Sequence, residues 1–299
     1  MVKNGLIWGL ALGLLILGGC GVKSEEPAAV FAKMTQTMSQ IEQLEFSGEF
    51  NILGSSTVAL LQGLQDLRVS GSGRVNLTNA NNIKYLLNLL ITGMSSEGKT
   101  EIGAELRSFP DVNYFRLTQI TMPLGLPFSL APDNKWYQIK SGGQNRELLG
   151  SNQPLTPDQL QLIRGLIANT KLFNVVQKFP DETVGGTRVY HWQVAVDKAA
   201  TRGLLQNWSN LTNPEDSINL EQWAAMLSDY TYEFWIGKYD HRLMRVLIKG
   251  WYDSLDQQRV EFNTQINFDR FSSIPAIERP TNVQEFNLRQ LLGLPNATQ

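Results

Sequence analysis

Apolar and polar residues alternate in several stretches of the chain, and this alternation constrains the fold more than any other feature. In the clearest example, residues 260–269, polar side chains alternate with Val260, Phe262, Ile266 and Phe268. Successive side chains of a strand point to opposite faces of a sheet, so a strand of this pattern has one buried face and one wet face. This arrangement is typical of antiparallel sheets.

The same period of two predicts further strands. It recurs in residues 46–52, 67–77 and 187–197, and residues 230–253 read as two strands joined by a turn near Tyr239-Asp240-His241. Gly71 and Gly73 interrupt the second of these stretches, which suggests a bent or bulged strand.

Helical spacing of apolar residues is confined to short segments. A helix is predicted over residues 27–41, a second after the capping box Thr156-Pro157-Asp158-Gln159, and a third after Asp197. Two more are predicted after Pro214 and after Pro280, the last of them with Val283 on its apolar side. Because strands and helices do not alternate regularly, we expect an α+β fold with a large antiparallel sheet and helices on one face.

The start of the chain has a pattern of its own. Lys3 precedes an apolar stretch, residues 6–17, which is shorter than the ~20 residues of a membrane span and predicts a signal peptide. The following residues, Leu17-Gly18-Gly19-Cys20, resemble the lipobox of bacterial lipoproteins, in which the cysteine is acylated. We expect residues 1–19 to be the signal peptide, 20–27 the lipidated Cys20 and a short tether, and 28–299 a single domain. An uncleaved anchor helix with an incidental cysteine is the alternative.

Composition excludes several classes of function. The formal net charge is −2, whereas a nucleic-acid-binding protein would need a basic face. Cys20 is the only cysteine in the sequence, so disulfides, paired-cysteine redox chemistry and cysteine-rich zinc sites are excluded. A lipid anchor on Cys20 would place the domain on the outer side of the cytoplasmic membrane or on an outer membrane, both of which are poor in ATP.

One octapeptide nevertheless satisfies the phosphate-binding loop motif. Residues 93–100, GMSSEGKT, supply Gly93, Gly98, Lys99 and Thr100 at the required spacing. Such a loop must join a strand to a helix, but a glycine at position 103 and a proline at position 110 leave little room for that helix. We therefore interpret the octapeptide as a hairpin turn and expect no nucleotide binding.

Other catalytic patterns are weaker still. Ser96 and Lys99 match S-x-x-K, but neither S-D-N nor K-T-G occurs. His191 and His241, the only histidines in the sequence, are far apart along it and lie in or beside predicted strands, so a structural role is expected for each. A zinc site would need nearby carboxylates that no motif identifies. We expect no enzymatic activity, no metal and no cofactor.

The order of these features resembles that of the LolA/LolB-like lipoproteins, in particular those of the LppX/LprG type. The resemblance rests on the lipobox, the N-terminal helix, the segments YFRLTQI, KWYQIK, GTRVYHWQVAVD and YEFWIGKYDHRLMRVLIKG, and the closing strand, and it covers most of residues 28–292. It implies a curved antiparallel half-barrel whose concave face is covered by helices. In that family an apolar cavity between sheet and helices accepts acyl chains, and members carry lipids or lipoproteins between membranes.

Two functions follow as hypotheses. The first is a membrane-anchored carrier or receptor for a lipid or lipoprotein cargo. Its candidate cavity residues are Trp192, Val194, Phe234, Phe262, Phe268, Ile163 and Ile167. The second is a tethered structural or interaction lipoprotein in which the same side chains fill a closed core, which is the more common fate of a single aromatic residue.

Overall fold

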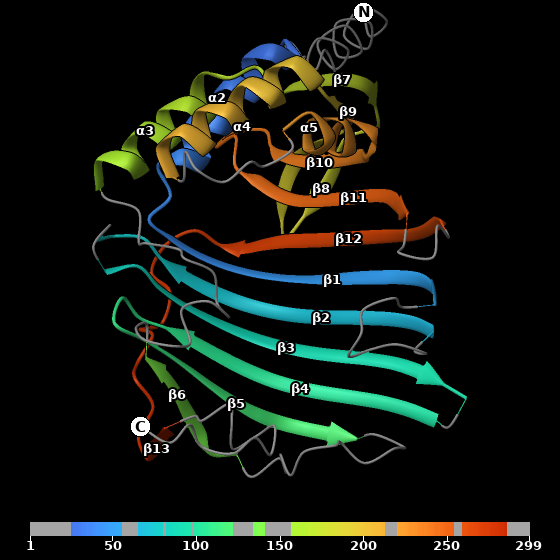
Figure 1. The fold of residues 1–299 in the computed structure, drawn as a ribbon. Coiled ribbons are helices and arrows are strands. Elements are labelled where there is room, and N and C mark those ends of the chain that lie inside the picture. The colour runs from blue at the N-terminus through green and yellow to red at the C-terminus, as the bar shows by residue number, and fades with distance from the viewer. Residues whose placement is uncertain are drawn as a thin grey trace, which may run out of the picture.

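The computed structural model describes residues 25–55, 65–79, 82–96, 98–121, 134–140, 157–212, 220–253 and 259–285. Within these ranges, the chain forms one large sheet and a group of four helices (Figure 1). None of the helices in the described ranges is long and apolar enough to cross a membrane.

The sheet has 13 strands in the order β13-β6-β5-β4-β3-β2-β1-β12-β11-β10-β9-β7, and β8 pairs separately with β9. All neighbours are antiparallel except β13 and β6. The strands are β1 (Gln43–Ser55), β2 (Gln65–Asn76), β3 (Lys84–Ser95), β4 (Gly98–Ser108), β5 (Val112–Thr121), β6 (Trp136–Lys140), β7 (Phe173–Lys178), β8 (Glu182–Val184), β9 (Thr187–Val196), β10 (Thr231–Gly237), β11 (Leu243–Asp253), β12 (Arg259–Arg270) and β13 (Val283–Glu285). The sheet is unclosed, because β13 and β7 end its order without pairing with each other.

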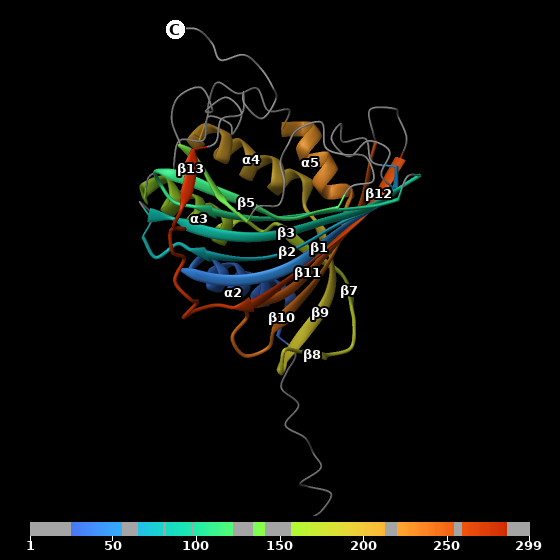
Figure 2. The same cartoon turned by 90° about the horizontal axis from the view of Figure 1, so that it is seen from below.

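The predicted antiparallel half-barrel is confirmed, and its helices lie on the concave side. The long strands are curved, and their hollow side faces α4 and α5 (Figure 2). The helices are α2 (Pro27–Ser39), α3 (Pro157–Asn169), α4 (Lys198–Thr212) and α5 (Leu220–Asp229). They gather at the end of the sheet formed by β7, β9 and β10, and none of the described helices crosses β2–β5 (Figure 1). Asp197 begins α4 as predicted, since its Oδ1 accepts the Ala200 N–H at 2.8 Å.

The main core lies between α2 and the β9–β11 part of the sheet. Val30, Phe31 and Met34 form the apolar stripe of α2 and are at most 7 % exposed. They pack against buried side chains of β9, β10 and β11, which are Tyr190, Trp192, Val194, Tyr232, Phe234, Ile236 and Val246. Alternation along these strands therefore places one apolar row under α2.

A second core lies on the opposite face, beneath the C-terminal segment. Ile277 packs with Leu86, Tyr114 and Trp136, and Val283 contacts the same cluster. The predicted helix after Pro280 is wrong for residues 283–285, which form β13 beside β6. Val283 lies opposite Trp136 in this pairing. Its side chain packs against the cluster of Trp136 and Ile277, and its backbone joins the sheet. The remainder of that predicted helix lies outside the described residues.

The glycines of β2 are not at a bulge. The β1–β2 register is continuous through Gly71 and Gly73, and its shift falls between Ile52 and Ser55. A Cβ atom at Gly73 would lie 2.5 Å from Cζ of Phe46 and 2.7 Å from Cδ2 of Leu87. Gly73 is thus needed because large side chains of the neighbouring strands lean across it.

Candidate functional site

The half-barrel has an apolar surface that continues beyond the main core. Cross-strand register places Phe50, Val69, Ile91 and Ile102 in one row on β1–β4. A second row combines Phe46, Leu87, Leu106 and Phe115, and Leu89 and Leu117 lie between the two rows. These ten residues, which we call the open apolar face, share the sheet face of Trp192 and Phe234 through continuous pairing across β12, β11 and β10.

Burial distinguishes the open apolar face from the main core. All ten of its side chains are only half-buried, whereas Trp192 is 2 % and Val194 1 % exposed. At one end of the face α2 packs on β9 and β10, whereas no described helix crosses β2–β5. At the edge of the open apolar face, Phe50 and Ile91 pack against a small buried cluster of Ile52, Leu67 and Val260. Half-buried aliphatic and aromatic side chains in adjacent rows provide the surface that a hydrocarbon chain would contact.

The structure brings three of the predicted cavity residues together. Trp192, Val194 and Phe234 are packed in the main core around Phe31, whose ring lies 5.5 Å from Trp192 and 6.2 Å from Phe234 between centroids. Phe268 on β12 packs against the edge of this cluster. These side chains are in contact with one another and with α2.

The other predicted cavity residues lie elsewhere. Phe262 contacts Phe50 at 5.8 Å and Tyr230 at 5.0 Å between ring centroids, next to the open apolar face. Ile167 lies on α3 and is 36 % exposed. Ile163 also lies within α3, but its side chain is outside the described residues.

A groove runs along α3 close to Ile167. Its volume is about 590 Å³, and Leu162, Gly165 and Leu166 supply its apolar lining. Leu162 is 55 % exposed, so this helix presents apolar atoms to the outside as well as to the domain. The groove is thus a second apolar feature on the helical side of the molecule.

The two histidines bond different partners. His191 Nδ1 lies 2.7 Å from Glu182 Oε1 and its Nε2 lies 3.0 Å from Glu233 Oε2, while its ring stacks between Phe179 and Trp235. The Trp235 N–H, followed by the His191 ring, lowers the pKa of Glu182. His241 instead lies 3.3 Å from Glu25.

The His191 contacts join β9 to β8 and β10 and engage both of its ring nitrogens. The His241 contact instead joins the turn between β10 and β11 to Glu25, just before α2, through Nε2. Within the described ranges, no group of three or more histidine and carboxylate side chains is placed to hold a metal ion.

The phosphate-loop octapeptide forms the predicted hairpin. β3 and β4 pair antiparallel up to Ser95 and Gly98. Lys99 is 59 % exposed at its side chain and pairs with Glu101 on the same strand at 2.5 Å. A loop between two antiparallel strands has no following helix whose N-terminus faces a phosphate, so the geometry that the motif needs is missing.

The sequence carries a partial signal for the open apolar face. Alternation in residues 101–107 marks Ile102 and Leu106 as one face of a strand. Residues 84–92 do not alternate, because Leu86 and Leu90 are apolar as well as Leu87, Leu89 and Ile91. The predicted cavity residues Trp192, Val194 and Phe234 lie on β9 and β10, where α2 covers them. Local alternation identifies a buried face, but it does not reveal which part of that face a helix will cover.

No family model and no curated protein matches the chain. Among solved structures, LprF from Mycobacterium bovis aligns with a TM-score of 0.46 and 11 % identity, over 85 % of this chain and 96 % of LprF. The Mycobacterium tuberculosis lipoprotein LppX aligns with a TM-score of 0.37 and 13 % identity, over 85 % of this chain and all of LppX. A β-barrel-like protein of a domain of unknown function from Brucella abortus aligns with a TM-score of 0.29 and 9 % identity, over 76 % of this chain and 99 % of that protein. These similarities are structural alignments at low sequence identity. The fold described above is established by the strand order and register of this chain.

Proposed function

We propose that the protein is a lipid-anchored extracytoplasmic lipoprotein that binds or carries a lipid or another amphiphile on its open apolar face. The observation that carries this proposal is the contrast in burial between the closed core under α2 and the ten half-buried side chains on β1–β5. Contiguous apolar surface of this kind is uncommon on monomeric soluble proteins and marks binding sites.

Hydrocarbon burial would supply the affinity. Each methylene removed from water contributes about 0.8 kcal/mol, so an acyl chain along two rows of aliphatic and aromatic side chains gains several such increments. The half-barrel curvature favours this mode of binding, because the hollow side of a curved sheet would surround an acyl chain on more than one side. The lipid anchor at Cys20 would keep the domain beside the membrane that supplies or receives the amphiphile.

Binding is tested with residues 21–299, which lack both the apolar segment 6–17 and the cysteine that would carry the lipid. Titration with a fluorescent fatty acid should give saturable binding, and native mass spectrometry of gently purified protein should show a bound lipid. Val69→Trp, on the open apolar face, should weaken binding at least tenfold while far-UV circular dichroism stays unchanged. Val194→Trp is unsuitable as a blocking variant, because Val194 is 1 % exposed and a larger ring would overpack the core.

A matched control is Ser72→Tyr on the opposite face of the sheet, which should leave fatty-acid affinity unchanged. Absence of saturable binding, or equal weakening by both variants, would contradict the carrier function. The tethered interaction lipoprotein with a filled core would then be the better account.

A further inference from the structure

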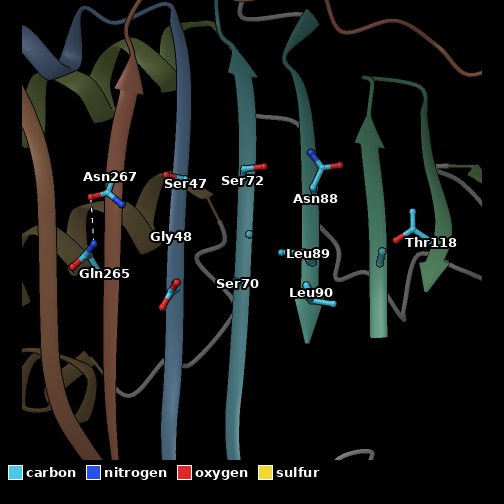
Figure 3. Close-up of a pocket in the computed structure, with 13 residues that line it drawn as sticks. Ser47, Gly48, Ser70, Ser72, Asn88, Leu89, Leu90, Thr118, Gln265 and Asn267 are labelled. Atoms are coloured by element: carbon cyan, nitrogen blue, oxygen red, sulfur yellow. Dashed lines mark hydrogen bonds between the residues drawn. The ribbon is translucent and has the colours of Figure 1, made fainter. Parts of the chain in front are cut away.

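The polar face of the sheet contains a trough that the lipid-carrier function does not use. It has a volume of about 450 Å³ and crosses the strands from β12 to β5 (Figure 3). Asn267, Ser47, Ser72 and Asn88 occupy paired positions along one wall. The spacing of ~4.8 Å between strands makes the trough roughly 24 Å long.

The second wall is formed two residues further along each strand. Gln265, Glu49, Ser70 and Leu90 are paired in register there, and the floor between the walls is backbone because the intervening side chains point to the apolar face. Serines at the centre of both walls keep the trough open. A larger side chain at Ser72 would close it.

The trough contains side-chain hydrogen-bond donors and acceptors that have no partner in the described structure. In the parts of the chain that the structure describes, the side chains of Ser47, Ser70, Ser72, Asn88 and Thr118 form no hydrogen bond. Hydroxyl and amide groups each donate and accept. A ligand that satisfies them must therefore carry donors and acceptors along its length.

Neighbouring contacts fix part of the lining. Asn267 Oδ1 accepts from Arg245 Nε at 2.7 Å and from Gln265 Nε2 at 3.4 Å, so the amide is oriented before any ligand arrives. At the other end, a register shift between Gly103 and Ala104 places Thr118 at the trough, and a Cβ at Gly103 would lie 2.6 Å from Thr118 Oγ1. A bulge that redirects a side chain is a common device beside binding sites.

Charge narrows the class of ligand. Glu49 is the only charged residue that lines the described trough, and Arg68 pairs with it. The lining thus has no net positive charge for a nucleic acid or another polyanion. Leu90 adds one apolar contact among the polar groups.

We propose that this trough binds a neutral oligosaccharide. A sugar chain presents hydroxyl groups that donate and accept, together with apolar C–H surfaces, and its elongated shape fits a trough that crosses six strands. The site is on the opposite face from the open apolar face, so it is independent of the proposed lipid binding.

The test uses the full lipidated chain in a zwitterionic detergent, titrated with maltotetraose and with chitotetraose by calorimetry and saturation-transfer NMR. At least one glycan should bind saturably with a Kd of about 1 mM or tighter. Ser72→Tyr should weaken this binding at least tenfold, whereas Thr92→Tyr, on the same face but outside the trough, should not.

Circular dichroism melting establishes that both variants are folded, and Asn88→Ala provides a milder change in the same trough. No saturable binding of either glycan, or equal weakening by Ser72→Tyr and Thr92→Tyr, would overturn the proposal. Fatty-acid titration of the same samples separates this outcome from a failure of the lipid-carrier function.

Discussion

Phe31 on α2 meets Trp192 on β9 edge to face, with 5.5 Å between their ring centroids and 67° between their planes. Phe31 also lies within 6.2 Å of Phe234 and 5.7 Å of Phe173. A single side chain of the first helix thus joins three aromatic residues from three different strands, and it closes the sheet–helix space at this end of the half-barrel.

Phe31→Ala should therefore destabilise the domain strongly. Removal of a fully buried phenylalanine leaves a cavity, and the expected loss is about 3–5 kcal/mol in the free energy of unfolding. Urea denaturation followed by tryptophan fluorescence measures the loss. Leu162→Ala on α3 is the control, since Leu162 is 55 % exposed and a change there should stay within about 0.5 kcal/mol. Similar losses for both variants would contradict the closed core.

Lys99→Ala should change neither thermal stability nor nucleotide response. Lys99 lies beside a tight hairpin and makes an exposed ion pair with Glu101, a kind of contact that contributes at most about 1 kcal/mol. Differential scanning fluorimetry with and without Mg-ATP measures both effects. A saturable, magnesium-dependent rise in melting temperature that is lost in Lys99→Ala would show that residues 93–100 bind nucleotide after all.

Cys20 should carry the lipid anchor. The residue lies outside the described structure, so this prediction rests on the LGGC sequence and the apolar stretch before it. Cells fed an alkyne fatty acid should label the wild-type protein, and Cys20→Ser should abolish the label. Labelled Cys20→Ser protein would rule out lipidation at this residue.

Local alternation predicted β1, β2 and β9 to β12, and helical spacing predicted the four described helices, but neither pattern was sufficient for the remaining strands or for the site. Alternation identified β12, and helical spacing identified α2, because each pattern is a property of one segment. The pairing of β1 with β12 joins residues more than 200 positions apart, and no local signal specifies it. The trough depends on serines that adjacent strands bring into register, so its existence follows from pairing rather than from any one strand.

Tertiary contacts also account for residues 283–285, which form a strand where a helix was predicted. Val283 and Phe286 satisfy helical spacing, yet the three residues add a parallel edge strand to β6. Arg279 pairs with Asp111 at 2.5 Å, and Arg107 donates to the Glu278 carbonyl oxygen at 2.9 Å. These tertiary contacts hold the C-terminal segment against the sheet and override the local preference.

Acid should loosen this C-terminal segment. Arg279 donates two hydrogen bonds to Asp111 and lowers the pKa of that carboxyl below its usual value, while Asp111 and Tyr114 raise the pKa of Arg279. Because the pKa of Asp111 is lower in the folded than in the unfolded chain, its stabilising contribution is present above the unfolded pKa, near 3.9, and is lost as the pH falls through the lower folded value. The side chain of Arg279 is 49 % exposed and that of Asp111 is 61 % exposed, so water screens the pair. Protonation of Asp111 is therefore expected to loosen the C-terminal segment without unfolding the domain.

Hydrogen exchange measured by mass spectrometry between pH 6 and pH 3, with rates corrected for intrinsic pH dependence, should show protection of residues 277–285 falling toward the acid end. Asp111→Asn should lower the protection at pH 6 and remove most of its pH dependence, because the amide has no charge to lose. Glu221→Gln is the control: Glu221 also has a lowered pKa, caused by Lys198, but it lies on α5 among the helices. If Glu221→Gln altered exchange at residues 277–285 as much as Asp111→Asn does, the Asp111–Arg279 pair would not be the contact that secures the segment.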